Sequence, residues 1–231
     1  MSLSALNPLQ PCSAIIFDCD GTLVDSTRLY FRAWNTLFKR HGAEMPWVWF
    51  AAHLGCSWPQ IFDEYQRECD ISLDAAAALQ LFNRAYRNEI DVLCEIKIVA
   101  DVARRHLGEI PMAVASGGTR EIVKATLLAT NLLALFDAVV TIEDVQGRGK
   151  PAPDIFLEAA RRLRVSPKEC TVFEDSDEGI EAARLAGMTA TDVRLVYRPA
   201  CCCWQPYVKG LIIMVNSSFK GNRREDIWLD K

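Results

Sequence analysis

The chain has 231 residues, of which 50% are hydrophobic and 24% charged, and its formal net charge is −4 at pH 7. This length and composition are those of a globular protein that can bury a full core. The slight negative charge offers no overall basic field for nucleic acid or a membrane surface. No apolar run reaches the ~20 residues of a membrane span, and the first dozen residues lack the basic and apolar segments of a secretion signal. Nine scattered cysteines without a CxxC pair indicate reduced thiols and a cytoplasmic protein.

The first part of the chain is predicted to be one strand followed by helices. A loose arm at residues 1–12 precedes a short buried strand at residues 14–17. Helical spacing then predicts three helices, at residues 27–40, 57–67 and 72–92. Ser26 or Thr27 can cap the first of them, Ser57 and Gln60 match a capping box for the second, and Ser72 begins the third. No strand signal interrupts residues 27–94, so these helices form a block that is inserted directly after the first strand.

From residue 96 the pattern alternates between helix and strand. The predicted strands are 110–115, 136–140, 170–173 and 190–193, and the predicted helices are 96–106, 119–129, one that ends near 163, and 177–186. Thr119 is the expected cap of the helix that starts there. This alternation is typical of a parallel sheet that is covered by helices on both faces. The tail from about residue 199, with three consecutive cysteines, has no predicted structure.

Polar residues follow the predicted strands at their carboxyl ends. They are Asp18 and Asp20, Ser116, Lys150 by way of a loop, and Glu174 with Asp175. Singly, each has an ordinary structural interpretation as a turn residue, a helix cap or a solvated lysine. The ends of parallel strands share one edge of the sheet, however, so the six side chains are expected to converge. Together they offer an attacking carboxylate, a second acid, a hydroxyl, a cation and carboxylate ligands for a hard ion such as Mg²⁺. This set of groups fits phosphoryl transfer.

Four segments resemble the four motifs of the haloacid dehalogenase superfamily. They are Asp18-Cys19-Asp20-Gly21-Thr22-Leu23-Val24-Asp25-Ser26, then Ala115-Ser116-Gly117-Gly118, then Gly149-Lys150-Pro151-Ala152-Pro153-Asp154-Ile155-Phe156, and finally Phe173-Glu174-Asp175-Ser176. The match runs in order over about residues 12 to 194. The helical block is similar to the small cap of the β-phosphoglucomutase-like branch, and residues 111–114, 136–140 and 192–195 look most like bacterial fructose-1-phosphatase-type sugar phosphatases. The resemblance implies an α/β fold with a Rossmann-like parallel sheet as core (1–26 and 96–231) and an inserted, all-helical cap domain (27–95).

The resemblance also implies roles for the polar residues. Asp18 attacks phosphorus and becomes a phosphoaspartate, while Asp20 protonates the leaving alcohol and then activates water. Lys150 neutralises charge on the nucleophile and the phosphate. Ser116 and the backbone amide of Gly117 bind phosphoryl oxygens.

For the metal, the resemblance implies Mg²⁺ held by Asp18, Asp175 and the backbone carbonyl of Asp20. Glu174 is expected to support this shell through water or hydrogen bonds. Thr22 is expected to stabilise its turn as well as the phosphate site.

The loop at residues 55–58 is the candidate for substrate choice, because a cap closes over the leaving group and excludes water. Trp58 in this loop fits either a substrate contact or plain core packing. Arg28, Arg32 and His53 are further candidates for substrate contacts, with solvated positions the commoner outcome for the arginines.

Two departures from relatives narrow the expected function. β-Phosphoglucomutases carry a His near Tyr30 and an Arg near Trp58, and both are missing here; dehalogenases lack the second Asp of the first motif, which is present as Asp20. We therefore predict a Mg²⁺-dependent phosphatase for a small phosphorylated metabolite, with a sugar phosphate as the expected substrate, working as a monomer or weak homodimer without nucleic-acid or membrane partners. The alternatives are a phosphomutase and a weakly active regulatory or binding protein.

Overall fold

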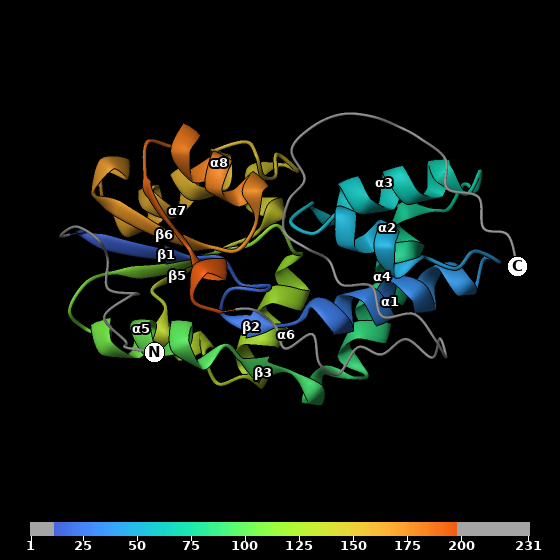
Figure 1. Ribbon diagram of the computed structural model, residues 1–231, viewed down its shortest axis with the longest axis horizontal. Coiled ribbons are helices and arrows are strands. Elements are labelled where there is room, and N and C mark those ends of the chain that lie inside the picture. The colour runs from blue at the N-terminus through green and yellow to red at the C-terminus, as the bar shows by residue number, and fades with distance from the viewer. Residues whose placement is uncertain (1–11, 198–231) are drawn as a thin grey trace, which may run out of the picture. The chain divides into compact units, whose positions relative to one another are not determined.

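The computed structural model describes residues 12–197, and its centre is a five-stranded sheet in the order β5-β4-β1-β6-β7 (Figure 1). The strands are β1 (Ala14–Phe17), β4 (Met112–Ala115), β5 (Ala138–Val140), β6 (Cys170–Glu174) and β7 (Thr189–Asp192). Every neighbouring pair in this sheet is parallel. The predicted arm, apart from Cys12, and the predicted Cys-rich tail lie outside the described residues.

Two helices cover each face of the sheet (Figure 1). They are α5 (Lys97–His106) and α6 (Arg120–Ala129) on one face, and α7 (Asp154–Leu163) and α8 (Asp177–Leu185) on the other. Alternate side chains of a strand point to opposite faces, and in β1 this sends Ile15 and Phe17 into one apolar cluster and Ala14 and Ile16 into the other. The predicted Rossmann-like α/β fold is confirmed.

A block of four helices, which we name the helical insert, lies between β2 and β3. Its members are α1 (Thr27–Lys39), α2 (Trp47–Ala52), α3 (Trp58–Glu68) and α4 (Ala75–Arg87). The two-residue strands β2 (Val24–Asp25) and β3 (Cys94–Glu95) pair antiparallel where the chain enters and leaves it. The insert has its own cluster of buried aromatic side chains, with Trp34, Phe62 and Phe82 among its members. Its standing as a separate cap domain stays a prediction.

Some predicted boundaries in the insert were wrong. Helix α4 starts at Ala75 rather than Ser72, because Asp74 supplies the cap by accepting the backbone N–H of Ala77 at 2.8 Å. It ends at Arg87, and the chain continues in a 3-10 turn at Ile90–Val92 instead of reaching residue 92 as one helix. The short helix α2 was not predicted, since its six residues carry no polar face from which a period could be read.

The other predicted helices and strands differ from the structure by at most two residues at their ends, whereas β2 and β3 were not predicted. The capping box of Ser57 and Gln60 is confirmed, with the backbone N–H of Ser57 donating to Gln60 Oε1 at 2.9 Å. Thr119 stands at the cap position of α6, but its side chain makes no capping hydrogen bond. Further 3-10 turns are Leu133–Leu135, Ile142–Val145, Pro167–Glu169 and Val193–Leu195. Within residues 12–197, no helix has the length and apolar character needed to cross a membrane.

Candidate active site

The turn after β1 brings the first two carboxylates to the carboxyl edge of the sheet. Asp18 is 5% exposed and follows the last residue of the strand directly. Gly21 turns the chain with a φ of +86°, and a Cβ at this position would lie 2.1 Å from Asp175 Oδ2. Such a separation is impossible for any side chain, so the turn requires glycine and brings its backbone against the fourth motif.

The Asp20 carboxylate is held by three hydroxyl groups. Ser26 Oγ donates to Asp20 Oδ1 at 2.7 Å, and both Tyr30 Oη and Ser116 Oγ donate to Asp20 Oδ2 at 3.2 Å. Burial raises the pKa of Asp20, and these hydrogen bonds oppose the rise. Ser26 was predicted as a possible helix cap; it stands at the cap position of α1, but its hydroxyl serves Asp20 instead.

Lys150 joins the first and fourth motifs. Its ammonium donates to Asp18 Oδ1 and to Glu174 Oε2, each at 2.6 Å, and Lys150 is only 4% exposed. Burial disfavours the ammonium, but the charges of Asp18 and Glu174 outweigh it and raise the pKa of Lys150, so the lysine stays charged. A solvated loop lysine, the ordinary alternative, is therefore excluded.

Glu174 accepts hydrogen bonds at both carboxylate oxygens. Oε2 receives Lys150, while Oε1 receives the backbone N–H groups of Asp175 and Ser176 at 3.0 Å and the Ser176 hydroxyl at 2.8 Å. A Cβ at Gly179 would lie 2.0 Å from Glu174 Cδ, so the first turn of α8 closes directly over this carboxylate. Glu174 therefore anchors the lysine and the turn together.

The carboxylates of this edge fit a divalent metal ion. One oxygen from each of Asp18, Glu174 and Asp175 lies within 4.8 Å of the others. Burial raises the pKa of Asp175 to about 7, with the charge of Glu174 adding to the rise and Lys150 and the Thr22 hydroxyl opposing it. Thr22 Oγ1 donates to Asp175 Oδ1 at 3.2 Å. Mutual repulsion among partly desolvated carboxylates is what a bound cation relieves, and Asp18 and Asp175 suit direct ligation better than Glu174, whose oxygens are engaged.

Ser116 and Gly117 follow β4 and face the same edge. Ser116 is 1% exposed and accepts the backbone N–H of Gly118 at 3.0 Å while donating to Asp20. Ser116 therefore stabilises its own turn, which is its ordinary structural role, and it also lies beside the Asp20 carboxylate. A Cβ on Gly117 would lie 3.8 Å from Ser57 Cα, which puts the second motif in reach of the helical insert.

Four side chains of the insert were predicted as candidates for substrate contacts. In the described residues, none of them contacts the carboxylates of the edge. Trp58 is 9% exposed and stacks on Trp34 and Phe62, with ring centroids 5.5 and 4.8 Å apart. Arg32 pairs with Glu89, His53 lies 3.1 Å from Glu64, and Arg28 is exposed. Trp58 therefore packs in the aromatic core of the insert, as one of its two predicted roles requires. Its contact with a substrate stays a prediction.

Two residues that touch Asp20 were missed from the sequence as members of the site. Ser26 stands at the cap position of α1 and Tyr30 lies four residues later in its first turn, and the backbone N–H of Tyr30 donates to the Ser26 carbonyl at 3.0 Å. Residues at this spacing share one face of a helix. That spacing, directly after the first motif, is the signal that could have found them.

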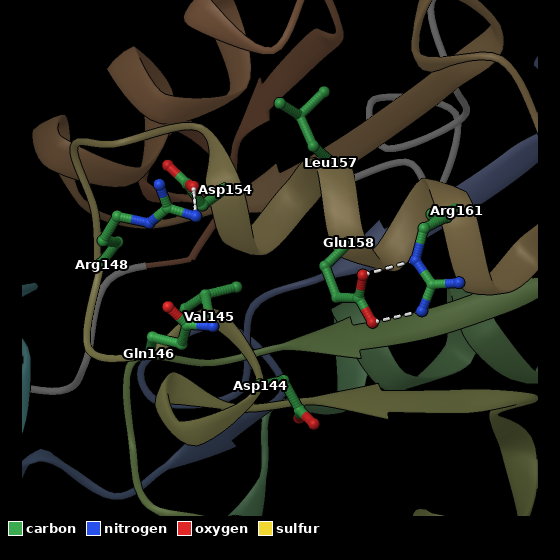
Figure 2. A pocket seen from close by; sticks show the side chains of 8 residues that line it. All are labelled: Asp144, Val145, Gln146, Arg148, Asp154, Leu157, Glu158 and Arg161. Carbon is green, nitrogen blue, oxygen red and sulfur yellow. Dashed lines mark hydrogen bonds and ion pairs between the residues drawn. The ribbon is translucent and has the colours of Figure 1, made fainter.

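A pocket of about 250 Å³ lies elsewhere on the core (Figure 2). Its lining residues are Asp144, Val145, Gln146, Arg148, Asp154, Leu157, Glu158 and Arg161. Arg148 pairs with Asp154 and Arg161 with Glu158, each at 2.7 Å. Asp144 pairs with Arg120 and Arg162 beyond the lining, so each charged lining residue has an ion-pair partner, and no residue of the carboxylate edge lines the pocket.

Comparison with known proteins agrees with this geometry. The family model of haloacid dehalogenase-like hydrolases matches residues 12–187. The chain is 36% identical over 184 residues to the fructose-1-phosphate phosphatase YqaB of Escherichia coli, covering 80% of this chain and 97% of that protein. It is 32% identical over 180 residues to the 6-phosphogluconate phosphatase of E. coli, covering 76% and 79%. The solved structure of CbbY from Rhodobacter sphaeroides with phosphate superimposes with a TM-score of 0.72 at 26% identity, covering 78% of this chain and 84% of that one.

The chain therefore belongs to the haloacid dehalogenase-like hydrolase family. With named phosphatases among its relatives, the prediction of an enzyme of the phosphatase type is confirmed. Phosphatases of this family use a divalent metal ion, and the acidic edge described above is where such an ion fits.

Proposed function

We propose that this protein is a Mg²⁺-dependent phosphatase that hydrolyses a sugar phosphate, or a similar small phosphoric monoester, through a phosphoaspartate on Asp18. The observation that carries the proposal is the buried contact of Lys150 with both Asp18 and Glu174. A second acid, Asp20, follows Asp18 by two residues. The named substrates of related phosphatases support a small sugar phosphate as the substrate class.

In the first step, a carboxylate oxygen of Asp18 forms a bond to phosphorus and the bond from phosphorus to the alcohol oxygen breaks. Lys150 donates to Oδ1 of Asp18, and within residues 12–197 no hydrogen bond engages Oδ2, which leaves that oxygen open for attack. Asp20 gives a proton to the departing alcohol oxygen, so the alcohol leaves neutral. Ser116 and the Gly117 amide hold phosphoryl oxygens, where they stabilise the charge that spreads over them.

In the second step, water replaces Asp18 on phosphorus. Asp20, now ionised, takes a proton from the water as it attacks; the bond between phosphorus and the Asp18 oxygen breaks, and phosphate leaves with Asp18 restored. The hydroxyls of Ser26 and Tyr30 hold the Asp20 carboxylate in place for both proton transfers, because the single hydroxyl hydrogen of Ser116 turns from Asp20 to a phosphoryl oxygen when the ester binds.

Mg²⁺, when bound, supplies positive charge that offsets the phosphate and the carboxylates. Asp18, Asp175 and the Asp20 backbone carbonyl would hold it, with Glu174 behind them through Lys150 and the turn at Ser176.

We also propose a cytoplasmic location for the enzyme. The free cysteines among residues 12–197 fit a reducing cytoplasm, and we propose a monomer or weak homodimer whose partner is its small substrate. A phosphomutase is the second candidate, since the solved relatives include a putative β-phosphoglucomutase from Thermotoga maritima. Tyr30, where mutases were expected to carry His, favours the phosphatase.

Release of phosphate from p-nitrophenyl phosphate tests the proposal. We expect turnover with Mg²⁺, none after chelation, and a loss of at least about 10³-fold in Asp18→Asn, which lacks the nucleophile. Asp20→Asn should accumulate a phosphoenzyme, detected as a mass increase of the intact protein. Equal rates for wild type and Asp18→Asn would refute the proposal, and conversion of one hexose phosphate into its isomer would favour the mutase.

A further inference from the structure

The loop Gly55–Ser57 of the helical insert lies across the turns of three motifs. A Cβ on Gly55 would be 2.7 Å from Ser176 Cβ, and a Cβ on Gly149 would be 3.1 Å from Ser57 Cβ. Gly149 precedes Lys150, and Ser57 also approaches Gly117. The loop is therefore close to any ester whose phosphoryl group is held beside Lys150 and Gly117.

An unpaired carboxylate lies at the Gly55 end of the loop. Glu178 is half-buried in the first turn of α8, and its Oε2 would be 3.0 Å from a Cβ on Gly55. Burial and then the charge of Glu178 raise the pKa of the Cys56 thiol, in keeping with this closeness. Across the described range 12–197, no hydrogen bond or ion pair engages the Glu178 carboxylate. Its helix neighbours Asp177 and Glu181 pair with Arg194 and Arg184.

No cation balances Glu178 in the described part of the chain. Lys150 is committed to Asp18 and Glu174. Four side chains of the insert pair with acids other than Glu178: Arg32 with Glu89, Lys39 with Glu44, His53 with Glu64 and Arg87 with Glu121. Arg28 is exposed and stands two residues before Tyr30, roughly 200° around α1 from the side chain that meets Asp20.

We infer that this phosphatase selects esters whose leaving alcohol is an uncharged polyol, and that Glu178 rejects alcohols that carry a carboxylate or a second phosphate. The inference rests on the proposed function, because it concerns the alcohol released at the same site. An anionic alcohol beneath the loop meets the unpaired Glu178 at a half-buried position, where like charges repel more strongly than in water. A neutral polyol donates hydroxyl hydrogen bonds to the same carboxylate. The relatives leave the question open, since one is named for fructose 1-phosphate and another for 6-phosphogluconate.

A matched pair of substrates tests this selection. Glucitol 6-phosphate and 6-phosphogluconate share a six-carbon chain with phosphate at one end and differ at the other, which is CH₂OH or a carboxylate. We expect kcat/KM of the wild-type enzyme with Mg²⁺ to be at least about tenfold higher for the glucitol ester, as one like charge at several ångströms predicts.

Three variants assign the selection to Glu178. Glu178→Gln keeps the shape of the side chain and removes its charge, so the ratio of kcat/KM for the glucitol ester to kcat/KM for 6-phosphogluconate should fall about threefold or more. Glu178→Lys should lower this ratio further or invert the preference. Glu181→Lys makes the same charge change on the exposed part of α8 and should leave the preference within about twofold of wild type. Far-UV circular dichroism confirms that each variant is folded.

The outcomes separate the two proposals. Hydrolysis of p-nitrophenyl phosphate with a wild-type preference near one, or in favour of 6-phosphogluconate, overturns the selection and leaves the phosphatase standing. An equal change of the kcat/KM ratio in Glu178→Lys and Glu181→Lys overturns the role of Glu178. Failure to hydrolyse any of the three esters overturns the proposed function itself.

Discussion

Three charged side chains at the carboxylate edge of the sheet are as deeply buried as the aromatic core of the helical insert, yet the two regions have opposite chemistry. At the edge, Asp18, Lys150 and Glu174 are 5, 4 and 1% exposed and carry charge. In the insert, Trp34, Phe62 and Phe82 are at most 2% exposed and carry none. Apolar burial stabilises a fold in proportion to area, whereas buried charges must be paired merely to offset their desolvation.

Function therefore depends on the charged edge, and much of the stability comes from apolar packing such as that of the insert. An apolar replacement of similar volume would serve stability at the edge at least as well as ions do, so the ions there are explained by chemistry. The insert has a packed core of its own and touches the edge through a loop and one tyrosine, which suits a part that covers a site without carrying its charges.

Lys150→Met should have the largest effect at the carboxylate edge, since it leaves Asp18 and Glu174 buried without a cation. We expect turnover to fall by about 10²-fold or more and the free energy of unfolding to fall by about 3 kcal/mol. Steady-state kinetics and urea unfolding measure the two effects. The control is Lys97→Met, which loses an exposed pair with Asp101 and should cost no more than about 0.5 kcal/mol. Full activity in Lys150→Met would contradict the assigned role.

Trp34→Ala tests the other region. Trp34 is fully buried between Phe82 and Trp58, and truncating it should cost about 3–5 kcal/mol of unfolding free energy. Val48→Ala in the same insert, at a side chain that is 78% exposed, should stay within about 0.5 kcal/mol of wild type. A loss below about 1 kcal/mol in Trp34→Ala would mean that the aromatic cluster does not stabilise the insert.

The stability of the metal-free protein should depend on pH through the buried carboxylates of the edge. Burial raises the pKa of folded Asp175 to about 7 from 3.8, so the folded state holds this proton more tightly than the unfolded chain does. The stability contributed by Asp175 is complete below about pH 4 and is lost as the pH rises to about 7. With chelator present, the Tm should therefore be higher at pH 5.5 than at pH 7.5.

Added Mg²⁺ should reverse that order, because it binds the ionised carboxylate and stabilises the folded state more at pH 7.5. Asp175→Asn is the matched variant and should flatten both responses. Thermal melting in four conditions, at both pH values with and without Mg²⁺, measures them. A metal-free Tm that rises from pH 5.5 to 7.5 would count against the buried, repelling carboxylates as its main cause.

Tyr30→Phe should give the smallest effect, at the point where the two regions meet. It removes one of three hydroxyl donors to Asp20, so we expect turnover to fall by roughly fivefold, as the loss of about one hydrogen bond predicts. Tyr65→Phe is the control, since its hydroxyl donates to the Glu44 carbonyl within the insert. Equal kinetics in the two variants would show that the Tyr30 hydroxyl does not support the acid.

The sequence predicted most of the fold because hydrophobic period and strand–helix alternation are local signals. Its misses were where structure depends on distant packing. The short helix α2 is set by contacts of Phe50 in the aromatic cluster, and the two-residue strands β2 and β3 exist only as partners of each other. Ser26 was read as a cap because its spacing fits one, but the acid beside it offers its hydroxyl a better acceptor.

The strand ends, the order of the four motifs and hence the residues at the carboxyl edge could be predicted from the amino-acid sequence, because parallel strands bring their ends together whatever their separation along the chain. Which of these side chains contact one another became clear from the folded structure alone. It paired Lys150 with both Asp18 and Glu174, gave Asp20 three hydroxyl partners, packed Trp58 into the insert and left Glu178 unpaired beneath Gly55. The physical reason is that hydrogen bonds and charge interactions act over a few ångströms, while these residues are brought within that range solely by the folding of segments up to 132 positions apart.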